Sequence, residues 1–188
     1  MFGKIFRLVR DIFIWIYVQI FKIIYYDKVY FSSKYFRGFR NQGWIIAAED
    51  IHNRIWKKKH RDIKWPVSPN IDCGANIEFD IDDLNNFWGS GNYFQTIDAK
   101  IVIGKGTWIA KNVGIVTSNH DLKNLDVHQK GKDVLIGKKC WLGMNCVILP
   151  GVILGDNTVV GAGAVVTHSF PEGNCVIGGN PAKLIRRL

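Results

Sequence analysis

The hydrophobic N-terminus of this chain lacks the long apolar run that a membrane-spanning helix requires. Residues 1–26 are dense in Ile, Phe, Trp and Tyr, yet their longest uncharged stretch runs only from Ile12 to Phe21 and contains Gln19. A transmembrane helix needs about twenty consecutive apolar residues. No small-residue cleavage site follows the block, so a secretory signal is not expected either. The pattern predicts a segment that neither crosses a bilayer nor is removed.

Closely spaced cysteine pairs are also absent. The four cysteines, Cys73, Cys140, Cys146 and Cys175, contain no CxxC spacing. This favours buried free thiols over a metal site or disulfides. Free thiols indicate a reducing compartment, and we therefore expect a cytoplasmic protein.

Acidic residues are in the minority, with 16 Asp and Glu against 25 Lys and Arg and a formal net charge of +9. Such a balance permits an anionic partner: a membrane surface, a phosphorylated cofactor or nucleic acid. The basic run at residues 57–61 is either a solvated face or a contact for lipid or substrate phosphate. No recognised nucleic-acid motif accompanies it, so nucleic acid is not an expected partner.

What the second half of the chain does contain is a branched aliphatic residue at every sixth position. Neither the 3.6-residue period of a helix nor the two-residue alternation of a strand gives this spacing. A period of six fits a solenoid with three flat faces, each built from one short strand and one turn per coil. The periodic residues are Ile103, Ile109, Ile115, Ile136, Leu142, Ile148, Leu154, Val160 and Val166.

Two further positions of each repeat support this solenoid. A glycine follows most periodic aliphatics, and we expect it to adopt a corner conformation that a Cβ would strain. Stacking of the inward aliphatics between coils contributes on the order of 1–3 kcal/mol each. The residue four positions after each aliphatic is mostly small, as a narrow interior requires. These residues are Thr107, Val113, Asn119, Cys140, Cys146, Val152, Thr158 and Ala164.

The motifs IGKGTW (103–108), IGKKCW (136–141), VGAGAV (160–165) and GGNPAKLIR (178–186) resemble the hexapeptide-repeat acyltransferases, and in particular their sugar and polysaccharide O-acetyltransferases. The resemblance covers about residues 70–188. It implies a mainly β fold, a left-handed parallel β-helix, whose handedness the period alone would not give. It also implies acetyl-CoA as co-substrate and a homotrimer with active sites between neighbours.

The six-residue period fails between Ile115 and Ile136, which lie 21 residues apart. Where a solenoid interrupts its period, a loop projects from the coil, and such loops often carry function. Here the loop is expected at about 120–134. Asn119, His120 and Asp121 open this loop. The resemblance implies that His120 is catalytic, because related acetyltransferases place their histidine at this step in an Asn-His or His-Asp context.

The chemistry of acyl transfer is consistent with a histidine here. A base must remove the hydroxyl proton during attack on a thioester, and imidazole, with an ordinary pKa of about 6.5, suits that role. Neither a metal nor a covalent enzyme intermediate is required. A carboxylate at the other ring nitrogen would fix the tautomer, and Asp121, Asp126 or a residue of an adjacent coil is a candidate. The alternative for His120 is a plain turn histidine, and His128 either lines the acceptor site or is solvated.

The resemblance further implies where the coenzyme binds. In that family the pantetheine arm lies in a groove between two solenoids and touches backbone at Trp-Leu-Gly and Gly-Ala-Gly corners, while nearby cations suit the phosphates. A corner-turning role for these glycines is compatible with coenzyme binding. The alternative for the basic C-terminus is a solvated tail. The implied residues are Trp141, Leu142, Gly143, Gly161, Ala162, Lys183 and Arg186.

Residues 1–69 are predicted to form a separate helical region that ends at Pro66 and Pro69. Lys4, Arg7, Asp11 and Lys22 share one helical stripe, and bulky apolar residues cover the rest of the surface. That surface either lies in a membrane interface or packs within an oligomer, and the sequence leaves both open. A second helix is predicted over residues 49–61, with His52 and His60 of little functional weight. Between Ile77 and Ile97 the period blurs, which predicts irregular coils or a small insertion at 80–91.

These observations predict an acetyl-CoA-dependent acetyltransferase that modifies a sugar hydroxyl, in surface polysaccharide or glycan synthesis at the inner face of the cell membrane. The alternatives are an amino-sugar N-acetyltransferase, a serine- or drug-type acetyltransferase, and a non-catalytic scaffold. A γ-class carbonic anhydrase is disfavoured because it needs three zinc-binding histidines, and only His120 and His128 are candidates. A sugar-nucleotide pyrophosphorylase would need a preceding nucleotide-binding half.

Overall fold

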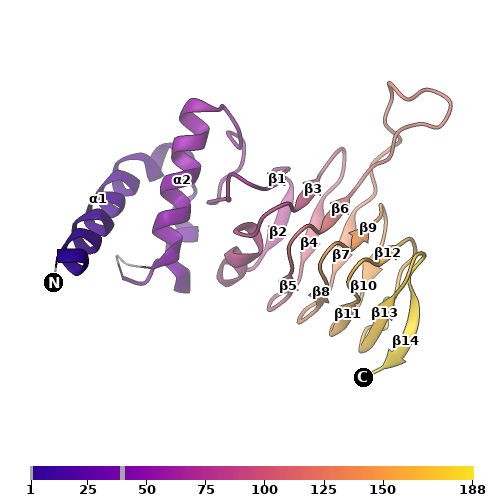
Figure 1. Cartoon of the computed structure of the whole chain (residues 1–188). Helices are drawn as coiled ribbons and strands as arrows, with labels where there is room; N and C mark the ends of the chain where they lie inside the picture. Colours follow the sequence, from indigo (N-terminus) through magenta and orange to yellow (C-terminus); the bar gives the residue numbers. More distant parts are fainter. Residues whose placement is uncertain (1, 39–40) are drawn as a thin grey trace. The chain divides into compact units, whose positions relative to one another are not determined.

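The computed structural model describes residues 2–38 and 41–188, so Met1 of the predicted N-terminal block lies outside the described residues. The chain divides into two compact units, residues 1–69 and residues 70–188. The first is helical and the second is built from short strands (Figure 1).

The second unit is the parallel solenoid that the six-residue period predicts, and the mainly β fold is confirmed. Its strands form three sheets, one on each face of the coil, with parallel pairing between successive coils. The first sheet holds β1 (Asp72–Cys73), β3 (Tyr93–Gln95), β6 (Gly114–Val116), β9 (Val147–Ile148) and β12 (Val165–Val166). The second holds β2 (Ile77–Phe79), β4 (Ile101–Ile103), β7 (Val134–Ile136) and β10 (Ile153–Leu154). The third holds β5 (Trp108–Ile109), β8 (Trp141–Leu142), β11 (Thr158–Val160), β13 (Cys175–Gly178) and β14 (Lys183–Arg187).

The periodic aliphatics form the core of this solenoid. Ile103 pairs with Ile136, and Ile136 with Leu154, so each side chain stacks on the same repeat position one coil away. All the periodic aliphatics are buried except Ile109, which is half-buried. The small residues four positions later are buried too, including the free thiols of Cys140 and Cys146. Asn119 is the exception, because its side chain is exposed where the coil gives way to the loop.

The glycines that follow the periodic aliphatics have a different role from the predicted one. None of them has a positive φ; the left-handed residues come two positions later, as in Asn145 (φ 62°) and Asn157 (φ 56°). Asparagine tolerates this conformation better than most residues. A Cβ on Gly143 would instead lie 2.7 Å from the backbone nitrogen of Ala162 on the next coil. The glycine is therefore needed for close approach of successive coils.

Two segments close the edges of the third sheet. The region where the period blurs is the 3-10 helix η3 (Ile81–Phe87). Its buried Asn86 accepts a hydrogen bond from the backbone N–H of Ile109 (2.9 Å) and donates one to the carbonyl of Thr107 (2.9 Å). At the other edge β14 pairs antiparallel with β13. Both segments satisfy backbone groups that an open sheet edge would leave unpaired.

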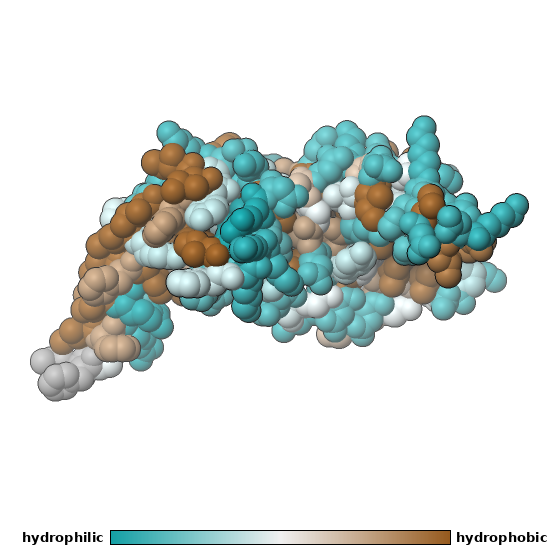
Figure 2. Space-filling view, turned by 90° about the horizontal axis from the view of Figure 1, so that it is seen from above, coloured by the Kyte–Doolittle hydropathy of each residue, from teal (hydrophilic) through white to brown (hydrophobic). Residues whose placement is uncertain are grey.

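The N-terminal unit consists of α1 (Phe2–Tyr25), the 3-10 turns η1 (Lys28–Ser32) and η2 (Lys34–Phe36), and α2 (Gln42–Trp56). Val18 of α1 is fully buried, and Trp15 packs edge-on against Trp44 of α2. The outer side of α1 presents large apolar side chains, a stripe that Figure 2 shows along the helix. Among the described residues, no helix combines the length and apolarity needed to cross a membrane.

The second helix differs from the predicted 49–61 in both bounds. It begins earlier, at Gln42, and it ends at Trp56, before the basic run. The physical reason for the end is local: Lys58 and His60 have positive φ angles (57° and 56°), which an α-helix cannot contain. The basic run is thus a turn and not a helical face.

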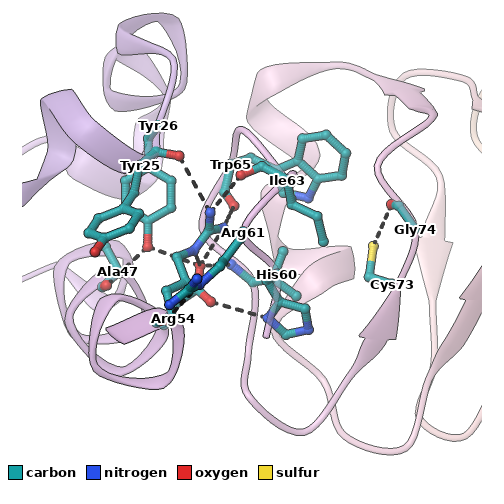
Figure 3. A network of polar contacts seen from close by, with 12 residues as sticks. Tyr25, Tyr26, Ala47, Arg54, His60, Arg61, Ile63, Trp65, Cys73 and Gly74 are labelled. Atoms are coloured by element: carbon teal, nitrogen blue, oxygen red, sulfur yellow. Dashed lines mark hydrogen bonds and ion pairs between the residues drawn. The ribbon is translucent and has the colours of Figure 1, made fainter. Parts of the chain in front are cut away.

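A buried ion pair lies at the centre of the N-terminal unit (Figure 3). Arg54 contacts Asp50 at 2.9 Å, and both side chains are fully buried. Arg54 also donates to the carbonyls of Ile63 (2.7 Å) and Trp65 (3.1 Å). His60, assigned little weight in the sequence, lies 3.2 Å from Asp50 through Nδ1. These contacts satisfy the buried charges, which would otherwise be strongly destabilising.

Candidate active site

The interruption of the six-residue period is a loop between β6 and β7. Ile103 and its partner Ile136 are 33 positions apart, whereas 18 positions separate Ile136 from its next partner, Leu154. The coil therefore carries an insertion, which Figure 1 shows projecting away from the sheets.

The base of this loop is fixed by hydrogen bonds to the preceding coil. The backbone N–H of Ser118 donates to Oε1 of Gln95 (3.0 Å), and the hydroxyl of Thr117 donates to the carbonyl of Ile97 (3.0 Å). Ser118 is buried and its hydroxyl also donates to the carbonyl of Gln129 (2.6 Å). These hydrogen bonds hold the two ends of the loop against the solenoid.

His120 stands on this base with a defined orientation. His120 and His128 form an antiparallel bridge, and their rings lie 4.3 Å apart between centroids. Nδ1 of His120 lies 2.6 Å from the carbonyl oxygen of Leu125. A carbonyl can only accept, so Nδ1 carries a proton, and in the neutral ring Nε2 is then the nitrogen with the free lone pair. The side chain is exposed, as a residue that meets a substrate must be.

The neighbouring acid shapes the loop and does not hold the imidazole. Oδ1 of Asp121 accepts hydrogen bonds from the backbone N–H groups of Lys123 (2.8 Å) and Asn124 (3.1 Å), an arrangement typical of an Asx turn. The ring nitrogen of His120 is instead held by the carbonyl of Leu125. Asn119 holds the base of the loop through its backbone, since its carbonyl accepts a hydrogen bond from the N–H of Gln129 (2.8 Å).

The residues implied for coenzyme binding lie at a different edge of the solenoid. Trp141 is exposed on β8, while the Leu142 side chain is fully buried and can contribute only backbone. Gly143 and the Gly161–Ala162 pair turn successive corners between the third sheet and the first. Lys183 follows on the next coil, near the Gly161–Ala162 corner. The preceding residue, Ala182, donates a hydrogen bond to the carbonyl of Val165, which lies just after that corner (2.8 Å). Lys183 and Arg186 are both exposed.

Within one chain these two sets of residues are not brought together. The His120 loop leaves the edge between the first and second sheets, after β6 and before β7. The Gly143 and Gly161 corners lie on the edge between the third and first sheets. The whole width of the first sheet separates the two edges. No group of three or more His, Cys, Asp or Glu side chains that could hold a metal occurs among the residues placed by the structure.

Sequence reasoning missed two features, one on the outer face of the third sheet and one in the loop. Trp108 is exposed and pairs in register with the exposed Trp141, so two indoles follow one another on the outside of the third sheet. Their shared place at the end of IGKGTW and IGKKCW was a visible signal. The second is the carbonyl of Leu125, which no sequence pattern identifies as the partner of His120.

Comparison with known proteins agrees with this architecture. The family model described as bacterial transferase hexapeptide (six repeats) matches residues 133–168. The chain is 39% identical over 178 residues to Escherichia coli WbbJ, which its name proposes as a lipopolysaccharide biosynthesis O-acetyl transferase, covering 77% of this chain and 88% of WbbJ. It is 34% identical over 186 residues to the galactoside O-acetyltransferase of Lactococcus lactis, covering 91% and 89%. The chain spans only 59% and 56% of the length of two other curated relatives, from yeast and E. coli.

A solved structure extends the likeness to three dimensions. The crystal structure of a hexapeptide-repeat acetyltransferase of Vibrio cholerae matches with a TM-score of 0.52 and 28% identity over 65% of this chain and 69% of that one. That Vibrio protein has also been crystallised with acetyl coenzyme A. The solenoid, its repeat and the near full-length relatives together show that the chain belongs to the hexapeptide-repeat acetyltransferase family.

Proposed function

We propose that this protein transfers an acetyl group from acetyl-CoA to a hydroxyl group of a sugar. The observation that carries the proposal is the tautomer of His120. The 2.6 Å contact between Nδ1 and the carbonyl of Leu125 fixes the ring, so that Nε2 is the basic nitrogen of the neutral form on an exposed loop. A neutral imidazole in a fixed orientation is what a general base for a hydroxyl requires.

The proposed reaction uses this geometry. Nε2 of His120 takes the hydroxyl proton as the sugar oxygen attacks the thioester carbonyl, so that a C–O bond forms. The carbonyl of Leu125 stabilises the imidazolium that results. The C–S bond then breaks, and the imidazolium returns its proton to the leaving thiolate. The products are an acetyl ester and free coenzyme A, and His120 regains its starting state.

The relatives support the choice of donor and acceptor. The Vibrio protein with the same fold binds acetyl coenzyme A. The relatives matched over most of their length are named for a galactoside and for lipopolysaccharide, both of which offer sugar hydroxyls. We therefore place the acceptor among sugars and glycans and propose a role in the synthesis of a surface polysaccharide.

We further propose that the active site forms between chains of a homotrimer. His120 and the Gly143 and Gly161 corners occupy separate edges of one solenoid, so they meet only if an edge of one chain faces a different edge of its neighbour. The exposed Trp108 and Trp141 offer an apolar surface for this packing. In the groove between chains, Lys183 and Arg186 would meet the coenzyme phosphates.

The N-terminal unit is proposed to bring the enzyme to an anionic membrane surface, where a lipid-linked glycan would be the acceptor. The outer face of α1 exposes Phe6, Phe13, Ile20, Ile23 and Ile24, each by more than 60%. A continuous apolar face of this kind is expensive in water and suits a bilayer interface. The net charge of +9 adds attraction to anionic lipid.

The test of the reaction is acetyl transfer from acetyl-CoA to a panel of sugars, amino sugars, nucleotide sugars and lipid-linked glycans, followed by release of the coenzyme thiol. We expect turnover on hydroxyl acceptors. Turnover confined to amino sugars would replace O-acetylation by N-acetylation. Absence of turnover together with absence of thermal stabilisation by coenzyme A would leave the scaffold alternative.

A further inference from the structure

A groove of about 850 Å³ opens between the two helices of the N-terminal unit. This volume is within the range of small-molecule binding sites. The walls are mostly apolar: Ile14, Tyr17 and Phe21 of α1 face Ile45, Ala48 and Ile55 of α2. The groove lies in the helical unit, far along the chain from the His120 loop, and the proposed reaction assigns it no role.

A buried amide without a partner lies in the groove wall. Asn53 is 2% exposed, and among the described residues neither its amide nitrogen nor its amide oxygen has a hydrogen-bond partner. Its neighbour in sequence, Arg54, is fully satisfied by Asp50 and two carbonyls. Buried amides are nearly always paired in folded proteins, and an orphan costs free energy. Neighbouring atoms close both amide atoms off from the groove, so a ligand group would reach them, and remove this cost, only after a shift of the groove wall.

The charge at the groove favours an anionic group on that ligand. Lys57 lines the groove, and Lys58 follows it, exposed in a left-handed turn. His52 also lines it and lies against Trp56, with 6.1 Å between ring centroids. The opposing charge is Glu49, whose side chain is exposed. Lys57 and Glu49 balance each other in the groove lining, and the further positive charge comes from Lys58, which follows just outside it.

The groove is continuous with the surface that is proposed to meet the membrane. Tyr17 and Phe21 line it from α1, and Phe13, Ile20 and Ile24 of the same helix form the exposed apolar face. A hydrocarbon chain that enters from the bilayer would therefore pass from one apolar environment into another.

We propose that the groove between α1 and α2 binds one anionic amphiphile, with its hydrocarbon chain between the two helices, its polar junction at Asn53 and its phosphate at Lys57 and Lys58. The inference rests on the proposed membrane contact and makes it specific, because it assigns a single lipid molecule to each chain. A second copy of this chain or a peptide would fill the apolar walls without requiring an anionic head.

The test is calorimetric titration of the full chain with dodecyl phosphate below its micelle-forming concentration. We expect one binding event per chain. Dodecyl maltoside, which has the same hydrocarbon chain and a neutral head, is expected to bind about ten-fold more weakly, and inorganic phosphate is expected not to bind. Equal affinity for both amphiphiles would overturn the phosphate assignment. The absence of saturable binding would overturn the proposal.

Two variants localise the site. Ala48→Phe fills the groove from α2 and is expected to lower affinity for dodecyl phosphate at least ten-fold. Asn53→Leu removes the orphaned amide, and we expect a melting temperature about 2–4 °C higher together with about ten-fold weaker binding. A purely structural role for Asn53 would not weaken binding. Unchanged affinity in both variants would contradict the assigned groove.

The matched control is Ile20→Ser, on the exposed face of α1 and outside the groove. It is expected to weaken association with vesicles but to leave the affinity for monomeric dodecyl phosphate unchanged. Failure of the groove proposal is also separable from failure of the proposed reaction, because Ala48→Phe is expected to retain acetyl transfer to a soluble sugar. Loss of amphiphile binding in Ile20→Ser would place the ligand on the outer face and overturn the groove.

Discussion

The imidazole of His120 is oriented by a main-chain carbonyl. Because the oxygen of Leu125 belongs to the loop backbone, the tautomer of the base depends on the fold of the loop and not on a second ionisable side chain. His128 supports the same ring from its flat side at 4.3 Å. Mutations that change the loop path should therefore affect turnover more than mutations that change its charge.

Two variants of Asp121 distinguish its role in the loop turn from the role of its charge. Asp121→Asn retains the oxygen that accepts from Lys123 and Asn124, and we expect kcat to fall less than about ten-fold. Asp121→Ala removes that acceptor and should have the larger effect on kcat. Steady-state kinetics of the two variants with one sugar acceptor measures both. If Asp121→Asn lowers kcat as much as removal of His120 does, the carboxylate charge is essential and the assignment to the loop turn is wrong.

Because the thiol of Cys146 is buried, we expect the free energy of unfolding to fall as the pH rises above 9. Burial raises the pKa of this thiol from 9.0 to about 12. Below pH 9 both states keep the proton, but between pH 9 and 12 the unfolded chain loses it first, so the free energy of unfolding falls. By pH 11 the loss is roughly 2–3 kcal/mol.

Urea unfolding of the protein and of Cys146→Ala between pH 8 and 11 measures this contribution. The alanine variant removes the titrating group, so the difference in unfolding free energy between the two proteins should change across this range. A difference that stays constant with pH would contradict the assignment.

At the scale of the coil, two glycine variants test why five of the periodic aliphatics are followed by a residue without a side chain. A Cβ on Gly143 would lie 2.7 Å from backbone atoms of the next coil, whereas one on Gly161 would find its nearest atom at an ordinary 3.4 Å. We expect Gly143→Ala to destabilise by about 1–3 kcal/mol and Gly161→Ala to be nearly neutral. Thermal unfolding of both variants measures this, and equal losses would favour a conformational role over close approach.

The elements also show which features of the fold could be predicted. The stacking of Ile103, Ile136 and Leu154 follows from a period of six, and the failure of that period located the loop. The end of α2 was not predictable from helix periodicity, because the left-handed turn at Lys58 and His60 depends on tertiary contacts such as that of His60 with Asp50. The same reason applies to the site: the sequence identified His120, but only the folded loop places the carbonyl of Leu125 at its ring.

For the whole molecule, the two units have separate tasks in this account. The solenoid carries the two parts of the proposed site at two edges, which the proposed trimer would join. The helical unit presents an apolar face and a groove that suit lipid. A protein built in this way would acetylate a glycan while held at the surface where that glycan is assembled.

The membrane contact is tested by vesicle sedimentation with the full chain. Replacing Phe13 and Ile20 with Ser removes two large apolar side chains from the outer face of α1, and we expect binding to anionic vesicles to weaken at least ten-fold. The matched control replaces Leu122 and Ile185, which are also more than 60% exposed but belong to the solenoid unit, and should bind as the unmodified protein does. Equal binding of both variants would assign the apolar face of α1 to protein packing instead.

The central claim is that His120 is the general base, and the turnover of His120→Ala with acetyl-CoA and a sugar acceptor tests it most directly. The control is His168→Ala, which removes an exposed histidine that hydrogen-bonds Thr167 (2.8 Å) at another corner. We predict that His120→Ala lowers kcat by about 10²-fold or more, with unfolding temperature and oligomeric state unchanged, while His168→Ala retains full turnover. Near-normal turnover in a folded His120→Ala protein would contradict the account.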